Sequence, residues 1–330
     1  MPKRRIAIGL LVSGAFLALL LRQVDRAELG DALGAVDARW LVAAFAVELG
    51  ALWVRALRWR LVLDGTVRIP TREAWSLVVI GYAANNVLPV RAGEVVRAQL
   101  LHDAHDVSRL AALGTIVVER ILDGLVLALL LAGTIAVAGG NSLLRWVAAV
   151  AVVGFVVATG LIAALALRPG ASAGVVALLR FTPARVRPAA RAWLGAFLAG
   201  LGTLRGGRAW AAVLATSLGG WVLEAGAYWL VGRGFGLPLE AGHYLAVCAA
   251  ANLAIAAPST AGGVGPFEFF AREVAVAFGT AAAAATAYAL VLHALLLVPV
   301  VLLGLLLLWQ RHLGVRALVR RAEATEEGAA

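Results

Sequence analysis

The chain has 330 residues, of which 62% are hydrophobic, and its mean hydropathy is +0.90. Soluble domains of this length do not carry so much apolar sequence, so a membrane protein is expected. The formal net charge is +10, but the basic residues are divided among short loops and chain ends. This division is typical of membrane proteins that follow the positive-inside rule, and it argues against nucleic-acid binding.

The predicted fold is all-α, a polytopic bundle of membrane helices. Six apolar runs have the length of full spans, at residues 6–22, 39–57, 110–138, 143–167, 209–232 and 281–309. The first is interpreted as an uncleaved span, because no small-x-small cleavage site follows it directly. One membrane domain is expected over residues 1–319, and residues 320–330 are expected to form a disordered cytoplasmic tail.

Five basic clusters, two of them at the chain ends, mark the side of the membrane that is expected to face the cytoplasm. They are Lys3 to Arg5; Arg55, Arg58, Arg60, Arg68 and Arg72; Arg168, Arg180, Arg185, Arg187 and Arg191; Arg205 and Arg208; and Arg311, Arg316, Arg320 and Arg321. The loop after the first span balances its arginines with Asp25, Glu28, Asp31 and Asp37, so it is expected outside.

Residues 175–205 differ from the spans because they mix arginines with apolar side chains. Trp193 and Phe197 lie in this stretch, and Pro183 and Pro188 interrupt it. The pattern predicts one or two amphipathic helices that lie on the inner leaflet.

Two further apolar segments, 74–101 and 243–279, are interrupted in the same order by Asn, Pro, Gly and Glu. The residues are Asn85, Asn86, Pro89, Gly93 and Glu94 in the first, and Asn252, Pro258, Gly262, Gly263, Gly265 and Glu268 in the second. A helix cannot run straight through proline. Backbone freed inside a bilayer survives only where protein or a water-filled cavity satisfies it.

Such a pair of broken segments predicts a transport site between the two halves of the chain. Each segment forms either a re-entrant hairpin or two half-spans. The loop charges predict that the first opens from the inner side and the second from the outer side, which would make an inverted repeat.

Two sets of charges lie inside apolar sequence: Glu119, Arg120 and Asp123 in one span, and Arg91, Glu94 and Arg97 in the first broken segment. A charge near the bilayer centre costs from about 2.5 to more than 10 kcal/mol, so such residues need partners. One interpretation is a buried network that faces a cavity, in which charges of one set form ion pairs with charges of the other. The alternative is a cluster near the cytoplasmic end that reaches water by snorkelling.

The residues after the first proline predict a site for an anionic head group. Arg91 and Gly93 stand where a half-helix should begin, and free N–H groups at a helix N-terminus favour phosphate. Arginine adds donors that match a phosphate fork. Asn85, Asn86, Arg91 and Arg97 are therefore candidates, unless Arg91 only pairs with a nearby glutamate.

In the second segment, Gly262, Gly263 and Gly265 give a backbone that a ligand can approach closely, ahead of Glu268. A tight turn without ligand contact is the alternative. His243 and His293 stand alone in the sequence, so no metal site is expected. The sequence shows no catalytic arrangement or cofactor motif, and no enzymatic activity is predicted.

Three motifs carry a resemblance to a known family. They consist of Asn85, Asn86, Pro89, Arg91, Gly93 and Glu94; of Glu119, Arg120 and Asp123; and of Pro258, Gly262, Gly263, Gly265 and Glu268. In this order they resemble the lysylphosphatidylglycerol synthase transmembrane-region family, also called flippase-like domain proteins. The resemblance covers residues from about 6 to 310.

The resemblance implies a multi-pass inner-membrane protein of bacteria or archaea. Some family members fuse this region to a cytoplasmic aminoacyl-transferase domain, and the membrane part is thought to move the aminoacylated lipid outward. This chain ends after its last span, so the resemblance implies a stand-alone member that does not synthesise the lipid itself.

The leading hypothesis is a lipid flippase or scramblase that binds the head group of an anionic phospholipid, an aminoacyl-lipid or a polyprenyl-phosphate-linked carrier. Membrane lipids are the expected partners, and a separate lipid-modifying transferase is a further candidate. Two alternatives stay open. One is an ion-coupled carrier of a small solute, and the other is a non-transporting scaffold for a membrane enzyme.

Overall fold

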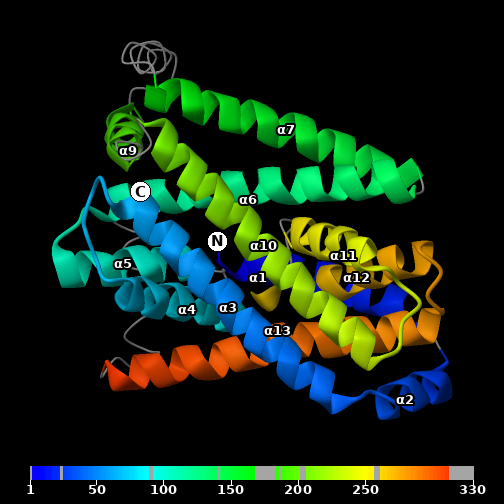
Figure 1. Cartoon of the computed structure of the whole chain (residues 1–330). Helices are drawn as coiled ribbons and strands as arrows, with labels where there is room; N and C mark the ends of the chain where they lie inside the picture. Colours follow the sequence, from blue (N-terminus) through cyan, green and yellow to red (C-terminus); the bar gives the residue numbers. More distant parts are fainter. Residues whose placement is uncertain are drawn as a thin grey trace.

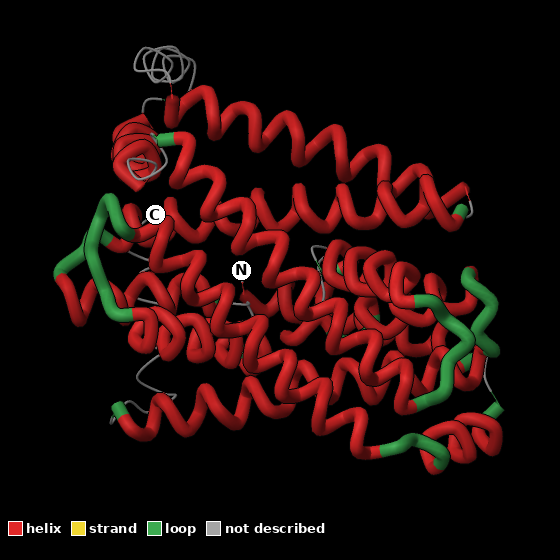
Figure 2. The backbone as a smooth tube through the Cα atoms, viewed as in Figure 1, coloured by secondary structure: helices red, strands yellow, loops and turns green. Residues whose placement is uncertain are grey.

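The chain folds into a bundle of helices in which long helices surround two pairs of short ones (Figure 1). A computed structural model describes residues 2–22, 25–88, 92–139, 142–167, 183, 185, 187–200, 206–255 and 261–311. Within these ranges every regular element is a helix, and Figure 2 draws no strand there. The predicted all-α membrane bundle is therefore confirmed.

Six long helices correspond to the six predicted spans: α1 (Pro2–Leu21), α3 (Ala38–Leu63), α6 (Arg109–Ala138), α7 (Ser142–Leu167), α10 (Gly207–Gly234) and α13 (Ala282–Gln310). Among the described residues, α3, α6, α7 and α13 are long and apolar enough to cross a membrane by length and composition. The shorter helices are α2 (Arg26–Gly34), α4 (Thr71–Val87), α5 (Gly93–His105), α9 (Arg187–Gly200), α11 (Ala241–Ala254), the 3₁₀ turn η3 (Ala261–Gly263) and α12 (Pro266–Ala277).

Both broken segments form hairpins of two half-helices. The half-helices α4 and α5 pack against each other, and so do α11 and α12. Figure 1 shows that the first hairpin enters the bundle from one end and the second from the opposite end. The re-entrant interpretation of both segments agrees with this arrangement.

The two hairpins belong to two similar halves, each consisting of a long helix, a hairpin and a second long helix. α4 of the first half packs on α13 of the second, and α11 of the second packs on α6 of the first. The leading helices α3 and α10 pack along each other and run antiparallel. The start of α3 lies beside the end of α10, where the Asp37 backbone N–H donates to the Gly234 carbonyl at 3.0 Å. The halves are thus related as an inverted repeat.

Small residues allow the half-helices to approach closely. Gly93 begins α5 directly beside Gly81 of α4, and a Cβ atom added to Gly93 would lie 1.9 Å from the Gly81 carbonyl oxygen. In the second hairpin, Gly265 precedes α12 with φ +99°, and its Cα faces the backbone of Ser13 in α1. A positive φ at this position favours glycine over any residue with a Cβ.

The helix α9 covers part of the stretch for which an amphipathic helix is predicted. Its Leu194 and Phe197 are buried against Val118 and Leu122 of α6, while Arg191 is exposed. The apolar face of α9 therefore packs on the bundle. Of residues 175–205, numbers 175–182, 184, 186 and 201–205 lie outside the described residues, as do the predicted tail at 320–330 and the breaks at Pro89 and Pro258.

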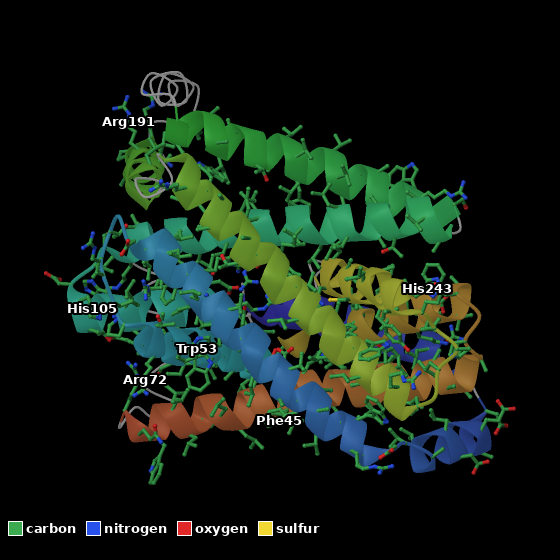
Figure 3. All side chains as sticks on the ribbon, viewed as in Figure 1. Phe45, Trp53, Arg72, His105, Arg191 and His243 are labelled. Atoms are coloured by element: carbon green, nitrogen blue, oxygen red, sulfur yellow. The ribbon has the colours of Figure 1, made fainter. Side chains whose placement is uncertain are left out.

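The charges at the two ends of the bundle differ. Figure 3 places Arg72, His105 and Arg191 at one end and His243 at the other. The first end also carries Arg68, Arg109, Arg185, Arg187, Arg208 and Arg311, whereas the second balances its arginines with Asp25, Glu28, Asp31, Asp37 and Glu240. The first end is the one that the positive-inside rule assigns to the cytoplasm, and this orientation stays a prediction.

We expect Gly93→Ala to destabilise the fold by at least about 1–3 kcal/mol, because the new methyl group would overlap a backbone oxygen that cannot move aside. Thermal unfolding of the purified protein in detergent measures the change.

Gly133→Ala in α6 is the matched control, since nothing lies within 4 Å of a Cβ added there. Alanine is favoured over glycine in a helix by about 1 kcal/mol, so this variant should keep or raise the unfolding temperature. Equal unfolding temperatures of Gly93→Ala and Gly133→Ala would contradict the close packing of α4 on α5.

Candidate functional site

The tips of the two hairpins border a cavity of about 430 Å³. Its charged and polar lining comes from both halves of the repeat: Glu48, Arg55, Tyr82, Asn85, Asn86, Glu94, Arg120, Asp123, Glu224, Asn252 and His293. Its apolar lining includes Leu52, Leu127, Phe155, Leu296, Leu297 and Val300. Ligand cavities in proteins have this size and this mixture of apolar walls with a few convergent polar groups.

Arg120 is the more accessible of the two arginines in the cavity wall, with 41% of its side chain exposed. Its ion-pair contacts are long, 3.5 Å to Glu94 and 3.8 Å to Asp123. The buried Nε makes the contact with Glu94 without a hydrogen bond, and the guanidinium lies 5.6 Å from the centre of the Tyr82 ring. Arg120 can therefore offer donors to a ligand without first breaking a short ion pair.

Asn85 connects the two half-helices of the first hairpin across their break. Its Oδ1 accepts the Gly93 backbone N–H at 2.7 Å, and its Nδ2 donates to Glu94 at 3.0 Å. The side chain thereby satisfies one of the free N–H groups at the start of α5. Asn86 lines the cavity beside it.

Behind the cavity wall, a network of buried charges joins α3, α5 and α6. Arg58 contacts Asp123 and also donates to Glu119 at 3.2 Å, while Arg97 pairs with the other oxygen of Glu119. The side chain of Glu119 is 3% exposed. The prediction that the two sets of charges complete each other is confirmed for Arg97 and Glu119, and snorkelling is wrong for this pair.

Aromatic side chains complete this network. The Arg97 guanidinium lies 3.8 Å above the Trp59 ring, where a cation–π contact is favourable. The indole N–H of Trp59 donates to Thr115, and that of Trp221 donates to Asp123 at 2.8 Å.

Arg55 and Arg58 were predicted to lie in a basic loop, and this assignment is wrong. The helix α3 continues to Leu63, so both arginines lie inside it with side chains at most 6% exposed. Arg55 pairs with Glu224 of α10. The missed signal was the spacing, since residues 55 and 58 share a helix face within apolar sequence.

In the second half, His293 of α13 joins the tip of the hairpin. Its Nδ1 lies 2.7 Å from Oε1 of Glu268, and its Nε2 lies 3.0 Å from the Gly262 carbonyl oxygen. The Gly265 N–H donates to the second oxygen of Glu268 at 2.7 Å. His293 stands alone in the sequence, and the fold gives it partners that are 25 and 31 residues away along the chain.

Two further carboxylates face the cavity from α3 and α10. Glu224 accepts a hydrogen bond from Asn252 at 3.0 Å as well as its ion pair with Arg55. Glu48 is buried, and its Oε2 has no hydrogen-bond partner.

The structure thus places the predicted site residues in four groups. Asn85, Asn86, Glu94, Arg120, Asp123 and Gly262 line the cavity; Arg97 and Glu119 lie behind it; Gly93, Gly263, Gly265 and Glu268 build the hairpins; Arg91, Pro89 and Pro258 lie outside the described residues. Their part in binding a substrate stays a prediction. In the described part of the chain, no three His, Cys, Asp or Glu side chains form a group that could hold a metal ion.

Comparison with known protein families identifies one match. The family model described as the lysylphosphatidylglycerol synthase transmembrane region matches residues 6–304. The matched region contains the first half of the repeat, the second half as far as residue 304, and every residue that lines the cavity.

Two curated proteins are similar to parts of the chain. A glycosyltransferase, AglD, of Haloferax volcanii is 33% identical over 129 residues, which are 38% of this chain and 20% of that protein. A UPF0104 membrane protein of Methanothermobacter thermautotrophicus is 27% identical over 124 residues, which are 37% of this chain and 37% of that protein. The similarity therefore spans about a fifth and about a third of the lengths of these relatives.

We expect Arg58→Ala to lower the stability of the folded protein by about 3–5 kcal/mol, because it leaves Asp123 and Glu119 buried with one cation fewer. Thermal unfolding in detergent measures the loss.

Arg68→Ala is the matched control, because Arg68 is 86% exposed and its contact with Asp64 is a surface ion pair. Its unfolding should be indistinguishable from that of the wild type. If Arg58→Ala unfolds no earlier than this control, the buried network does not stabilise the bundle.

Proposed function

The chain belongs to the lysylphosphatidylglycerol synthase transmembrane-region family, and from this premise we propose that it translocates lipids between the leaflets of a membrane. The observation that carries the proposal is the cavity between the tips of two hairpins that enter the bundle from opposite ends. Broken helices around a central site are the usual architecture of transporters built from inverted repeats.

The size of the cavity supports a lipid head group as the ligand. A volume of about 430 Å³ holds a small polar molecule or a head group, but not the acyl chains of a lipid as well. We propose that the chains stay in the surrounding bilayer while the head group enters. The apolar residues Leu296, Leu297 and Val300 of α13 form part of the cavity wall on which an acyl chain can pack.

Arg120 is the proposed contact for the phosphate of the head group. It is partly exposed in the cavity wall, its ion pairs are long, and its planar fork matches a phosphate. Asn85 and Asn86 supply amide groups on the facing hairpin.

The cavity wall also contains the carboxylates Glu48, Glu94, Asp123 and Glu224 beside the arginines Arg55 and Arg120. Both signs of charge are therefore available to a ligand. A head group that carries an amine as well as a phosphate fits this wall better than a purely anionic one, because the amine can face the carboxylates. We propose an aminoacyl-lipid ahead of the anionic phospholipid and the polyprenyl-phosphate carrier.

We further propose that the protein lies in the cell membrane with its basic end toward the cytoplasm. A separate transferase would supply the modified lipid, and the chain itself would catalyse no reaction. The similarity to a glycosyltransferase supports a place beside a transferase.

A carrier of a small water-soluble solute is the second candidate, and Glu48 favours it. A buried carboxylate oxygen without a hydrogen-bond partner, in the wall of a central cavity, is where a coupling cation or proton could bind.

The test is the quenching of fluorescent head-group lipids by dithionite in proteoliposomes, with an aminoacylated, an anionic and a polyprenyl-phosphate probe. We expect quenching beyond the outer leaflet for at least one probe. Arg120→Gln should slow it about 10- to 100-fold, because a charge-assisted hydrogen bond contributes about 1.5–3 kcal/mol.

Arg39→Gln is the control, since Arg39 is 91% exposed at the start of α3 and pairs with Asp37 there. It should translocate lipid at the rate of the wild type. Absence of protein-dependent quenching with all three probes would exclude the lipid proposal and favour the solute carrier.

A further inference from the structure

The imidazole of His293 has a hydrogen-bond acceptor at each of its two nitrogens. Nε2 lies 3.0 Å from the carbonyl oxygen of Gly262, which can only accept. Nδ1 lies 2.7 Å from Oε1 of Glu268, and the other oxygen of that carboxyl group already accepts the Gly265 N–H. Both nitrogens therefore need a proton on the line to their partner.

A neutral histidine and an ionised glutamate hold one proton between them, and this arrangement needs two. The second proton lies either on Nδ1, which gives an imidazolium beside a carboxylate, or on Oε1, which gives a neutral imidazole beside a carboxylic acid. The two forms differ only in which heavy atom carries the proton, so His293 and Glu268 together hold two protons in either form.

The His293–Glu268 pair lies where the second hairpin meets both α13 and the cavity. His293 lines the cavity, and its side chain is 7% exposed. The pair joins α13 to both sides of the hairpin tip, since Gly262 belongs to η3 and Glu268 to the first turn of α12. The ring of Phe267 stacks on His293 with centroids 4.2 Å apart, a contact that favours a cationic imidazole.

We propose that His293 and Glu268 form a proton-binding site that opens to the cavity, and that its proton holds the second hairpin docked against α13. Without the proton, one ring nitrogen would turn a lone pair toward an acceptor at hydrogen-bond distance, either the Glu268 carboxylate or the Gly262 carbonyl oxygen, and the repulsion would release the hairpin tip. For a lipid translocator, which rests on the proposed function above, the proton would be the ion that couples hairpin movement to a pH gradient.

Other titratable groups surround this site. From helices that pack on α13, the cavity receives Glu48 and Arg55 of α3, Tyr82 of α4 and Glu224 of α10. Across the cavity lie Glu94 of α5 with Arg120 and Asp123 of α6. On α12, Arg272 pairs with Glu273, and α2 brings Glu28 and Asp31 to the end of the bundle opposite the basic one.

Most of these charges already have an ion partner, since Arg55 pairs with Glu224 and Arg120 contacts Glu94 and Asp123. Glu48 lacks a hydrogen bond at Oε2, so it is the competing candidate for a proton. Its contribution has to be separated from that of the His293–Glu268 pair by experiment.

The direction of the pH effect follows from the proton count. Above about pH 6.5 an isolated histidine is neutral and an isolated glutamate is ionised, so the undocked pair holds one proton fewer than the docked pair. Docking therefore takes up one proton. The equilibrium constant for opening the hairpin should rise about tenfold for each unit of pH above this value.

Nuclear magnetic resonance of the protein in nanodiscs, with ¹⁵N-labelled histidine and ¹³C-labelled glutamate, tests the proton count directly. We expect His293, assigned by its loss in His293→Gln, to show a doubly protonated ring, or a neutral ring beside a protonated Glu268 carboxyl group, at about pH 7.5, above the ordinary histidine range. His243 is the internal control, because its Nδ1 accepts the Glu240 backbone N–H and must be unprotonated. A neutral His293 beside an ionised Glu268 would overturn the proposal.

Hydrogen exchange measures the docking of the hairpin. The amide protons of residues 261–277 should become less protected from exchange, about tenfold for each pH unit. This loss is counted in excess of the intrinsic pH dependence of exchange, for which the first hairpin, residues 71–105, is the reference. Glu268→Gln should remove this excess, because the glutamine amide can donate to Nδ1 and accept from Gly265, so that no extra proton is needed.

Glu48→Gln is the matched control, since it makes the same chemical change in the same cavity without touching the hairpin tip. It should keep the excess loss of protection. If Glu48→Gln removes the excess and Glu268→Gln keeps it, the proton resides on Glu48 and the proposal is wrong.

These two measurements require no transport. A wild type that moves no lipid but shows the protonated pair and the pH-dependent hairpin would exclude the proposed function and keep this inference. A wild type that moves lipid, with a pH dependence that Glu268→Gln leaves unchanged, would overturn the inference and keep the function.

Discussion

The bundle depends on ion pairs that join the arginines buried in its interior to carboxylates on other helices. An unpaired charge in such surroundings costs several kcal/mol. Arg55 of α3 meets Glu224 of α10, 169 residues further along the chain, and Arg58 meets Asp123 of α6, 65 residues further. Because both arginines lie on one helix, α3 is fixed to α6 and α10 together, and the cavity forms where these helices and the two hairpin tips meet.

The two halves of the repeat share a backbone arrangement but differ in the chemistry at their hairpin tips. The first hairpin is closed by a neutral amide, since Asn85 bonds both Gly93 and Glu94. The second is closed by the ionisable pair of His293 and Glu268. A symmetric scaffold therefore presents an asymmetric cavity. Such a difference allows one hairpin to respond to a condition that leaves the other unchanged.

Much of the fold follows from the sequence, because the bilayer imposes strict lengths and charge rules. Apolar runs of about 20 residues predicted the long helices, and proline with glycine predicted the two breaks. The pairing of Arg97 with Glu119 was predictable because each set of charges lacked partners of its own. The same charge rule misplaced Arg55 and Arg58, since an arginine near the end of a span looks the same in sequence whether it faces water or a buried carboxylate. His293 was missed because its partners lie 25 and 31 residues away.

The pairing of Arg55 with Glu224 also determines what happens while the chain is being made. A ribosome adds about 5–20 residues each second, so Glu224 emerges roughly 8 to 34 s after Arg55. During that interval α3 carries a cation for which its permanent partner does not yet exist. The insertion machinery, or a temporary contact with Glu48 on the same helix, has to shelter the charge. The ion pair can form only when α10 docks on α3, so the fixation of α3 has to wait for the second half of the chain.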